Sequence, residues 1–244
     1  MSALKTFSTI ALLLLLSGSV YAATAEDLDR ADNDVSDTES LQRGARYFVN
    51  YCLGCHSAQY VRYNRVAEGL QLTEEQLTDN LMFTGVRPFD PMTNSMSAED
   101  AERWFGVSPP DASLLARSLG TDYIYSFLRS FYVSPDRPNG VDNTVLPGTA
   151  MPHVLWELQG TQAAVFSEGE NGAEEFEHFE RVSPGALTEQ EYDAVVRDIV
   201  NFLDYVSEPM QLERRAIGAR VIAFLLVFLV LSYLLKKEIW SDVE

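Results

Sequence analysis

Apolar residues recur at helical spacing in two separate stretches of the chain. Within residues 38–50, and again within residues 192–206, they lie three or four positions apart, so each set falls on one face of a helix. The first set is Leu41, Ala45, Phe48 and Val49, and the second is Tyr192, Val195, Val196, Ile199, Phe202, Leu203 and Val206. The pattern predicts two amphipathic helices, the second of which should end at Ser207-Glu208-Pro209.

Helix start signals support these elements and add others. Thr73 with Gln76, and Thr188 with Glu191, have the spacing of a capping box, in which each side chain bonds the backbone N–H of the other residue. Helices are therefore expected to begin just after Thr73 and just after Thr188.

The middle of the chain predicts two more helices and long connections. Ser108-Pro109-Pro110-Asp111 is typical of a helix start, with serine as the N-cap and proline in the first turn, and Gly120 should end that helix. The aromatic-rich stretch 122–132 predicts the next one. No convincing alternating run indicates a strand. The expected fold class is therefore mostly α, with long loops around residues 84–100 and 133–150.

The N-terminus has the pattern of an export signal. Lys5 precedes an apolar run from Ile10 to Leu16, and small residues follow as far as Ala22. The run is short for a membrane-spanning helix, but its length and its small-x-small ending are typical of a secretory signal peptide. We expect residues 1–22 to be removed on export.

The C-terminal apolar stretch is long enough to cross a bilayer. Residues 216–235 are apolar apart from Arg220 near one end, and two lysines follow them. Such a length suits a hydrocarbon core of roughly 30 Å, and a buried soluble helix would not be apolar on every face. This predicts a transmembrane anchor at 214–237 and a cytoplasmic tail at 238–244.

Together the two ends predict one exported domain, residues 23–213, held at a bacterial inner membrane and facing the periplasm. The formal net charge of the chain is −18. This acidic balance excludes nucleic acid as a partner and favours basic proteins, although acidic surfaces also simply maintain solubility. The run 167–180 is the most acidic segment, with six glutamates and no lysine or arginine. It predicts an exposed hairpin or loop.

The candidate chemistry lies in the motif Cys52-Leu53-Gly54-Cys55-His56, which contains both cysteines of the chain. A thioredoxin-like disulfide would need a preceding strand, but the motif follows a predicted helix. Zinc would need four nitrogen or sulfur ligands, and His153 and His178 have no paired spacing. The C-x-x-C-H pattern instead favours one covalently bound haem c, in which the thiols are tethers and His56 is an axial ligand of the iron.

The second axial ligand is less constrained by the pattern. The segment 147–152, Pro-Gly-Thr-Ala-Met-Pro, has the character of a loop between two helices, and a thioether held on such a loop would suit the open face of a haem. Met151 is therefore the favoured candidate and His153 a rival. Met82, Met92, Met96 and an open site remain further alternatives.

Several stretches resemble the cytochrome c1 family, the haem c subunits of the ubiquinol–cytochrome c oxidoreductase (bc1) complex. They are Leu41 to Ala45, YCLGCHSAQYVRYNR from Tyr51, Trp104-Phe105-Gly106, Ser108 to Asp111, Asp122 to Tyr125, Gly148 to Pro152, and the single anchor after Pro209. The resemblance covers essentially the whole mature chain and is closest to the compact proteobacterial form.

The resemblance implies a class I c-type cytochrome domain with Cys52 and Cys55 as thioether cysteines and with His56 and Met151 as iron ligands. It implies an electron-transfer subunit that is not an enzyme by itself. Electrons would pass from the Rieske iron–sulfur protein through the haem to a soluble or membrane-bound cytochrome c, with cytochrome b and membrane lipid as further partners. Where the family often has a second arginine near a haem propionate, this chain keeps Arg117 but has Leu119.

Two other functions remain open at this stage. One is a membrane-tethered c-type cytochrome of another respiratory complex. The other is an exported thiol–disulfide oxidoreductase that uses Cys52 and Cys55. In the second case the thiols would react, whereas in a cytochrome they only hold the haem.

Overall fold

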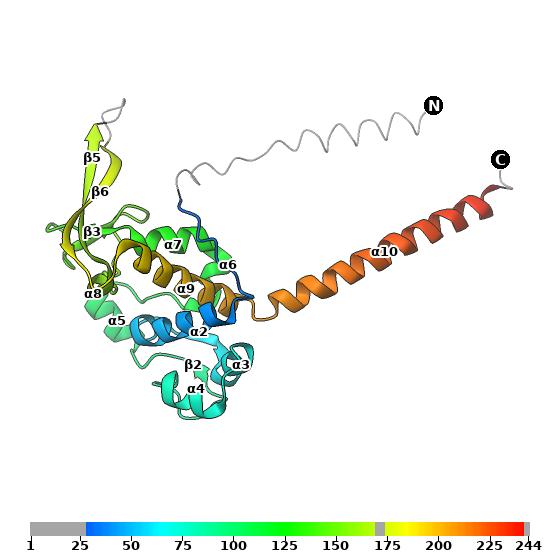
Figure 1. Cartoon of the computed structure of the whole chain (residues 1–244), viewed down its shortest axis with the longest axis horizontal. Helices are drawn as coiled ribbons and strands as arrows, with labels where there is room; N and C mark the ends of the chain where they lie inside the picture. The colour runs from blue at the N-terminus through cyan, green and yellow to red at the C-terminus, as the bar shows by residue number, and fades with distance from the viewer. Residues whose placement is uncertain (1–27, 169–173, 242–244) are drawn as a thin grey trace.

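Two helices that cross at very short range form the centre of the domain. The computed structural model describes residues 28–168 and 174–241. Within them α2 (Thr38–Tyr47) lies across α9 (Glu189–Ser207), as Figure 1 shows. A Cβ atom at Gly44 would lie 2.0 Å from the backbone oxygen of Asp198 and 2.8 Å from the Cβ of Phe202. Only glycine permits this approach of the two backbones.

A buried carboxylate ties the same two helices together. Asp198 on α9 accepts hydrogen bonds from the hydroxyl of Ser40, at 2.7 Å, and from Nε and Nη2 of Arg43, at 2.7 and 3.0 Å. Burying this carboxylate costs free energy, and the hydrogen bonds to both of its oxygens offset that cost. Removing Arg43 would leave the buried charge of Asp198 without its counter-ion, so this pair favours one register of the crossing.

The predicted helical stripes are confirmed as the core. All of the apolar positions of the two stripes are buried, and Phe48 packs on Phe202 with ring centroids 5.5 Å apart. Both predicted capping boxes are present, at Thr73 with Gln76 and at Thr188 with Glu191. Further helices surround this pair: α3 (Tyr63–Gly69), α4 (Glu74–Asn80), α5 (Ala98–Phe105), α6 (Leu115–Leu119), α7 (Thr121–Arg129) and α8 (Trp156–Gln159).

The helix start expected at Ser108 is wrong. Asp111 is the N-cap instead, since its side chain accepts the backbone N–H of Ser113, and a 3₁₀ turn (Ala112–Leu114) leads into α6. The two prolines before it belong to no helix, because proline disfavours a helical conformation in the residue that precedes it. Gly120 ends α6 as predicted, whereas α7 ends at Arg129, short of the expected boundary.

The expectation that the chain has no strands is also wrong. Three two-stranded antiparallel sheets occur among the described residues: β1 (Ala58–Arg62) with β2 (Pro91–Met92), β3 (Phe131–Val133) with β4 (Val141–Asn143), and β5 (Gly160–Glu168) with β6 (Glu174–Pro184). The β5–β6 hairpin projects from the domain (Figure 1) and leaves both faces partly exposed, so it lacks the alternating pattern of a half-buried strand. The fold remains mostly α.

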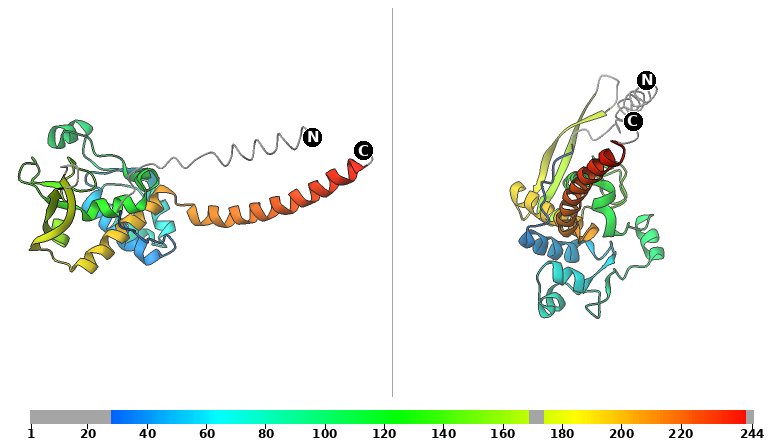
Figure 2. Two further views of the ribbon diagram at one scale, coloured as in Figure 1. Left: turned by 90° about the horizontal axis from the view of Figure 1, so that it is seen from above. Right: turned by 90° about the vertical axis from the view of Figure 1, so that its right-hand side faces the viewer.

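The C-terminal helix stands apart from the domain. α10 (Gln211–Ile239) follows α9 after a connection of three residues and extends away from it as one long rod, as the left view in Figure 2 shows. It is long and apolar enough to cross a membrane, and none of its most apolar segment is buried. The expected signal peptide, residues 1–22, and the end of the tail lie outside the described residues.

Replacing Gly44 with alanine should lower the free energy of unfolding by about 1–3 kcal/mol, because the added methyl group forces two backbones apart. The direction of the change is informative, because replacing glycine with alanine at an unconstrained helical position would raise the free energy of unfolding by about 0.5–1 kcal/mol. For a domain of this size the melting temperature should fall by roughly 2–4 °C per kcal/mol. Thermal unfolding of the full-length protein in detergent measures the effect.

Glu39→Ala, on the exposed side of the same helix, is the control and should stay within about 0.5 kcal/mol of wild type. A Gly44→Ala protein as stable as the wild type would contradict the close crossing.

Candidate functional site

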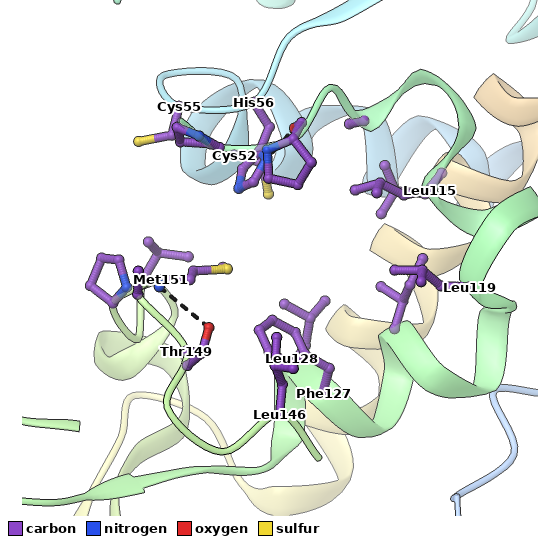
Figure 3. Close-up of a pocket in the computed structure, with 18 of the residues that line it drawn as sticks. Cys52, Cys55, His56, Leu115, Leu119, Phe127, Leu128, Leu146, Thr149 and Met151 are labelled. Carbon is purple, nitrogen blue, oxygen red and sulfur yellow. Dashed lines mark hydrogen bonds between the residues drawn. The ribbon is translucent and has the colours of Figure 1, made fainter. Parts of the chain in front are cut away.

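The cysteine motif follows directly from the central crossing. After α2 the chain makes one π-helical turn (Phe48–Cys52), a rare element that is frequent at functional sites. The backbone N–H groups of Cys55 and His56 then both bond to the carbonyl of Cys52, at 3.0 and 2.8 Å. This tight turn brings both thiols and the imidazole to one wall of a cavity (Figure 3).

The cavity is large enough to hold a cofactor. Its volume is about 490 Å³, within the range of roughly 300–1,000 Å³ that is usual for ligand pockets. Apolar side chains from several helices form most of its lining, among them Leu115 and Leu119 of α6, Phe127 of α7, and Ile199 and Leu203 of α9. No carboxylate, guanidinium or ammonium group lines it. The shape and polarity suit a large, flat, mainly apolar group.

A backbone carbonyl sets the tautomer of His56. Nδ1 of His56 lies 2.8 Å from the carbonyl oxygen of Pro110. A carbonyl can only accept, so Nδ1 carries the proton and donates it, and Nε2 keeps its lone pair for a metal. Asp111 fixes the position of Pro110, because it caps the following turn and also accepts the backbone N–H of Gln59 at 3.1 Å.

Met151 lies on the facing wall, on a loop held by polar contacts. Figure 3 shows its sulfur pointing into the cavity, across from the cysteine motif. The loop turns at Gly148, where φ is +80°. The backbone N–H of Gly148 donates a hydrogen bond to Oδ1 of Asp142 at 2.7 Å. The carbonyl of Met151 accepts from the amide of Asn139 at 3.3 Å, and its N–H lies 3.4 Å from the hydroxyl of Thr149. The thioether is therefore presented by a fixed backbone.

The rival ligands do not line this cavity. Among the methionines of the described residues, only Met151 does so, and Met92 is fully buried elsewhere in the core. The ring of His153 stacks instead on Phe131, with centroids 5.1 Å apart and planes 7° apart. Burial lowers the pKa of His153 to about 4. The nearby Gly160 backbone and Gln159 side chain raise the pKa, but by less than burial lowers it. His153 is thus a neutral, turned-away neighbour of the loop.

The site does not suit the other chemistries considered. Burial raises the pKa of Cys52 to about 12 and also raises the pKa of Cys55, whereas reactive thiols have lowered pKa values. No group of three or more histidine, cysteine or carboxylate side chains in the described part of the chain is placed to hold a metal ion. The cavity presents two thiols and an imidazole on one wall and a thioether on the facing wall.

Arg117 does not supply a charge to the cavity. It pairs with Glu208 at 3.1 Å, across the end of α9, and does not line the pocket, while Leu119 does. Three groups that position the site gave no sequence signal: the Pro110 carbonyl, Asp142 and Asn139. Their roles depend on contacts between stretches that only the fold brings together.

Comparisons with known proteins point the same way as the geometry. The pattern that defines the Cytochrome C1 family matches residues 32–171 and 179–243. The chain is 48% identical over 239 residues to cytochrome c1 of Allochromatium vinosum, covering 96% of this chain and 98% of that protein. It is 40% identical over 235 residues to a Nitrosomonas europaea protein named ammonia monooxygenase gamma subunit, covering 96% and 97% of the two chains. Cytochrome c1 of Rhodospirillum rubrum is 27% identical over 242 residues, covering 85% and 83%.

Replacing Asp111 with alanine should lower the free energy of unfolding by about 1–2 kcal/mol, because it removes the N-cap of the turn after Pro110. Asp111→Asn should retain most of the stability, since asparagine caps about as well as aspartate. Denaturant unfolding of the full-length protein compares the three. Equal losses in both variants would show that the charge, and not the cap, holds this segment.

Proposed function

The chain belongs to the cytochrome c1 family and carries a covalently bound haem c, and we propose that Cys52, Cys55, His56 and Met151 hold that haem in the electron-transfer subunit of a ubiquinol–cytochrome c oxidoreductase. One observation carries the assignment of these residues. Two thiols and an imidazole with a free Nε2 face a thioether across a single apolar cavity. This donor set fits a haem c with histidine and methionine as axial ligands.

Each residue has a separate task in this proposal. The haem iron supplies a reversible one-electron change. Cys52 and Cys55 form the thioether bonds, so their raised pKa values matter little once the bonds exist. His56 binds through Nε2, and the hydrogen bond from its Nδ1–H to Pro110 orients the ring and raises its basicity. Met151 provides a thioether that favours the reduced iron and raises the potential.

The apolar lining acts in the same direction as the thioether. A cavity without charged side chains disfavours the extra positive charge of the oxidised iron. No general acid, base or nucleophile is required of this chain, so it carries electrons for the complex and is not an enzyme by itself. Its contribution is to hold one haem at a set potential and to present it to partners.

The partners and the location follow from family membership and from the ends of the chain. We propose cytochrome b and the Rieske iron–sulfur protein as partners within the complex, and a soluble or membrane-bound cytochrome c as the acceptor. The exposed apolar rod α10 supports a single-pass anchor at 214–237 in the bacterial inner membrane. The export signal at 1–22 supports a periplasmic haem domain and a cytoplasmic tail.

The relative from Nitrosomonas europaea is named after a different enzyme. Likeness of the haem domain therefore does not by itself decide which larger complex a member joins. The higher identity to a cytochrome c1, 48% against 40%, favours the reductase for this chain.

The β5–β6 hairpin is the proposed docking surface for a basic cytochrome c. Glu175, Glu177 and Glu180 of β6 are exposed on this projecting element, while Glu170 of the same acidic run lies outside the described residues. Exposed charges of this kind act mainly on the rate of association. The alternative is that the run only maintains solubility.

Haem should remain with the wild-type protein after acid–acetone extraction, because thioether bonds survive a treatment that removes non-covalent haem. Met151→Leu should keep the haem but lose the weak far-red band of ferric iron–methionine coordination, and its reduction potential should fall. Optical spectra and a redox titration test both points. Extractable haem would contradict covalent attachment, and a surviving band would contradict Met151 as the ligand.

Changing Glu175, Glu177 and Glu180 to glutamine should slow electron transfer to a basic cytochrome c by at least about threefold at low salt. The effect should vanish as the Debye length shortens from about 10 Å at 0.1 M to about 3 Å at 1 M salt. Stopped-flow kinetics at several salt concentrations measure it.

The matched control changes three exposed acidic residues of α4, namely Glu74→Gln, Glu75→Gln and Asp79→Asn, at the far end of the domain from the hairpin (Figure 1). It removes the same charge and should have much less effect. Equal slowing in both triple variants would assign the effect to overall charge and overturn the docking surface.

A further inference from the structure

We propose that His153 is the positioning residue of the methionine loop, and that its imidazole, held between Phe131 and Gln159, keeps Met151 at its place across the cavity from His56. This inference rests on the proposed role of Met151 as an iron ligand. It concerns a buried histidine that has no other task in the site.

Aromatic contacts connect His153 with the cavity wall. Its ring stacks face to face on Phe131, with centroids 5.1 Å apart. Phe131 in turn makes an edge-to-face contact with Phe127 at 5.1 Å, and Phe127 lines the cavity. One residue, Pro152, separates His153 from Met151, so an anchored His153 limits how far the thioether can withdraw.

The polar side of the ring faces a complementary group. Nε2 of His153 and Oε1 of Gln159 are both buried without a hydrogen-bond partner of good geometry, yet the Gln159 side chain acts on the imidazole as a hydrogen-bonding group. A donor and an acceptor buried together are satisfied by a small rotation or by one shared water molecule. Nε2 of His153 and Oε1 of Gln159 are the donor and the acceptor that this contact would join.

Gln159 carries this contact to the end of α7. Its amide donates to the carbonyl of Arg129 at 3.0 Å, and the amide of Gln162 donates to the same carbonyl at 2.9 Å. Arg129 is the last residue of the helix that supplies Phe127 to the cavity. Through its ring face and its ring nitrogen, His153 thus joins the methionine loop to the C-terminal end of α7, the helix that supplies Phe127 to the cavity wall.

Packing alone does not account for a histidine here. The side chain is only 8% exposed, and a buried polar atom left unpaired costs about 1–3 kcal/mol. Phenylalanine would stack on Phe131 without that penalty. The imidazole is the side chain that both stacks and reaches Gln159, which is what a residue fixing the loop in one position requires.

Imidazole added to the ferric, full-length protein in detergent is the probe, because it binds the iron only when Met151 has left it. Its apparent affinity therefore reports the fraction of molecules with the loop open. Loss of the His153 contacts, in His153→Ala, should raise this affinity by about tenfold, which corresponds to roughly 1.4 kcal/mol. His153→Phe keeps the stacking and His153→Gln keeps a polar group, so each should have a smaller effect in the same direction.

The reduction potential is measured on the same samples and should decline in the order of the imidazole affinities, while the far-red band should remain until added imidazole replaces Met151. Tyr205→Phe is the matched control: Tyr205 is buried, its hydroxyl donates to the Arg65 carbonyl at 3.2 Å, and neither residue lines the cavity. This variant should be less stable to denaturant but bind imidazole as the wild type does.

The outcomes separate the two proposals. The wild-type protein gives the imidazole affinity with the methionine loop closed, and Met151→Leu gives the affinity with the iron site open. If these two bind imidazole equally and neither has the far-red band, the ligand assignment fails and the positioning role fails with it. If they differ but all three His153 variants match the wild type, only the positioning role is overturned. If His153→Ala does not accumulate as folded protein, the imidazole affinities of His153→Phe and His153→Gln test the positioning role in the same way.

Discussion

The close crossing of α2 and α9 at Gly44 is the constraint from which the rest of the domain follows. Two backbones meet with no side chain between them, and a paired carboxylate, Asp198, fixes their register. α2 leads without a break into the turn that carries the cysteine motif, while α9 contributes Ile199 and Leu203 to the cavity behind it. A shift of one helix along the other would therefore move the tethers relative to the wall they face.

The two sides of the cavity are held by different means. On the histidine side a backbone carbonyl, at Pro110, directs the imidazole, and the side chain of Asp111 caps the turn that follows it. On the methionine side the loop depends on polar side chains, through Asp142 and Asn139, and on the stacked ring of His153. An iron–thioether bond is weaker than an iron–imidazole bond, so the protein has more need to restrain the methionine side.

Parts that project from the core suit contacts with other molecules. The apolar rod α10 has no packing partner within the described chain and needs a lipid or protein environment. The β5–β6 hairpin leaves both faces partly exposed and carries acidic side chains near its tip. The core itself holds the cofactor and needs no large motion, as expected for a protein that transfers electrons and makes no bonds.

The sequence alone determined the features that depend on local spacing. Helical stripes, two capping boxes, the C-x-x-C-H motif and the apolar C-terminal stretch can each be recognised because neighbours in the chain are neighbours in space. The strands β5 and β6 gave no alternating signal, since neither face is fully buried, although the acidic run 167–180 predicted an exposed hairpin or loop there. Ser108 looked like a helix start, but the prolines after it belong to no helix and Asp111 is the cap.

Only the tertiary structure shows that Met151 lines the cavity and that His153, two residues further along the same loop, does not. Their separation along the chain says nothing about which side chain enters the cavity. That choice depends on Phe131 and Gln159, which take up the imidazole, and on Asp142, which turns the loop at Gly148. These contacts join stretches distant in sequence, and their geometry exists only once α2 and α9 have fixed where each stretch lies.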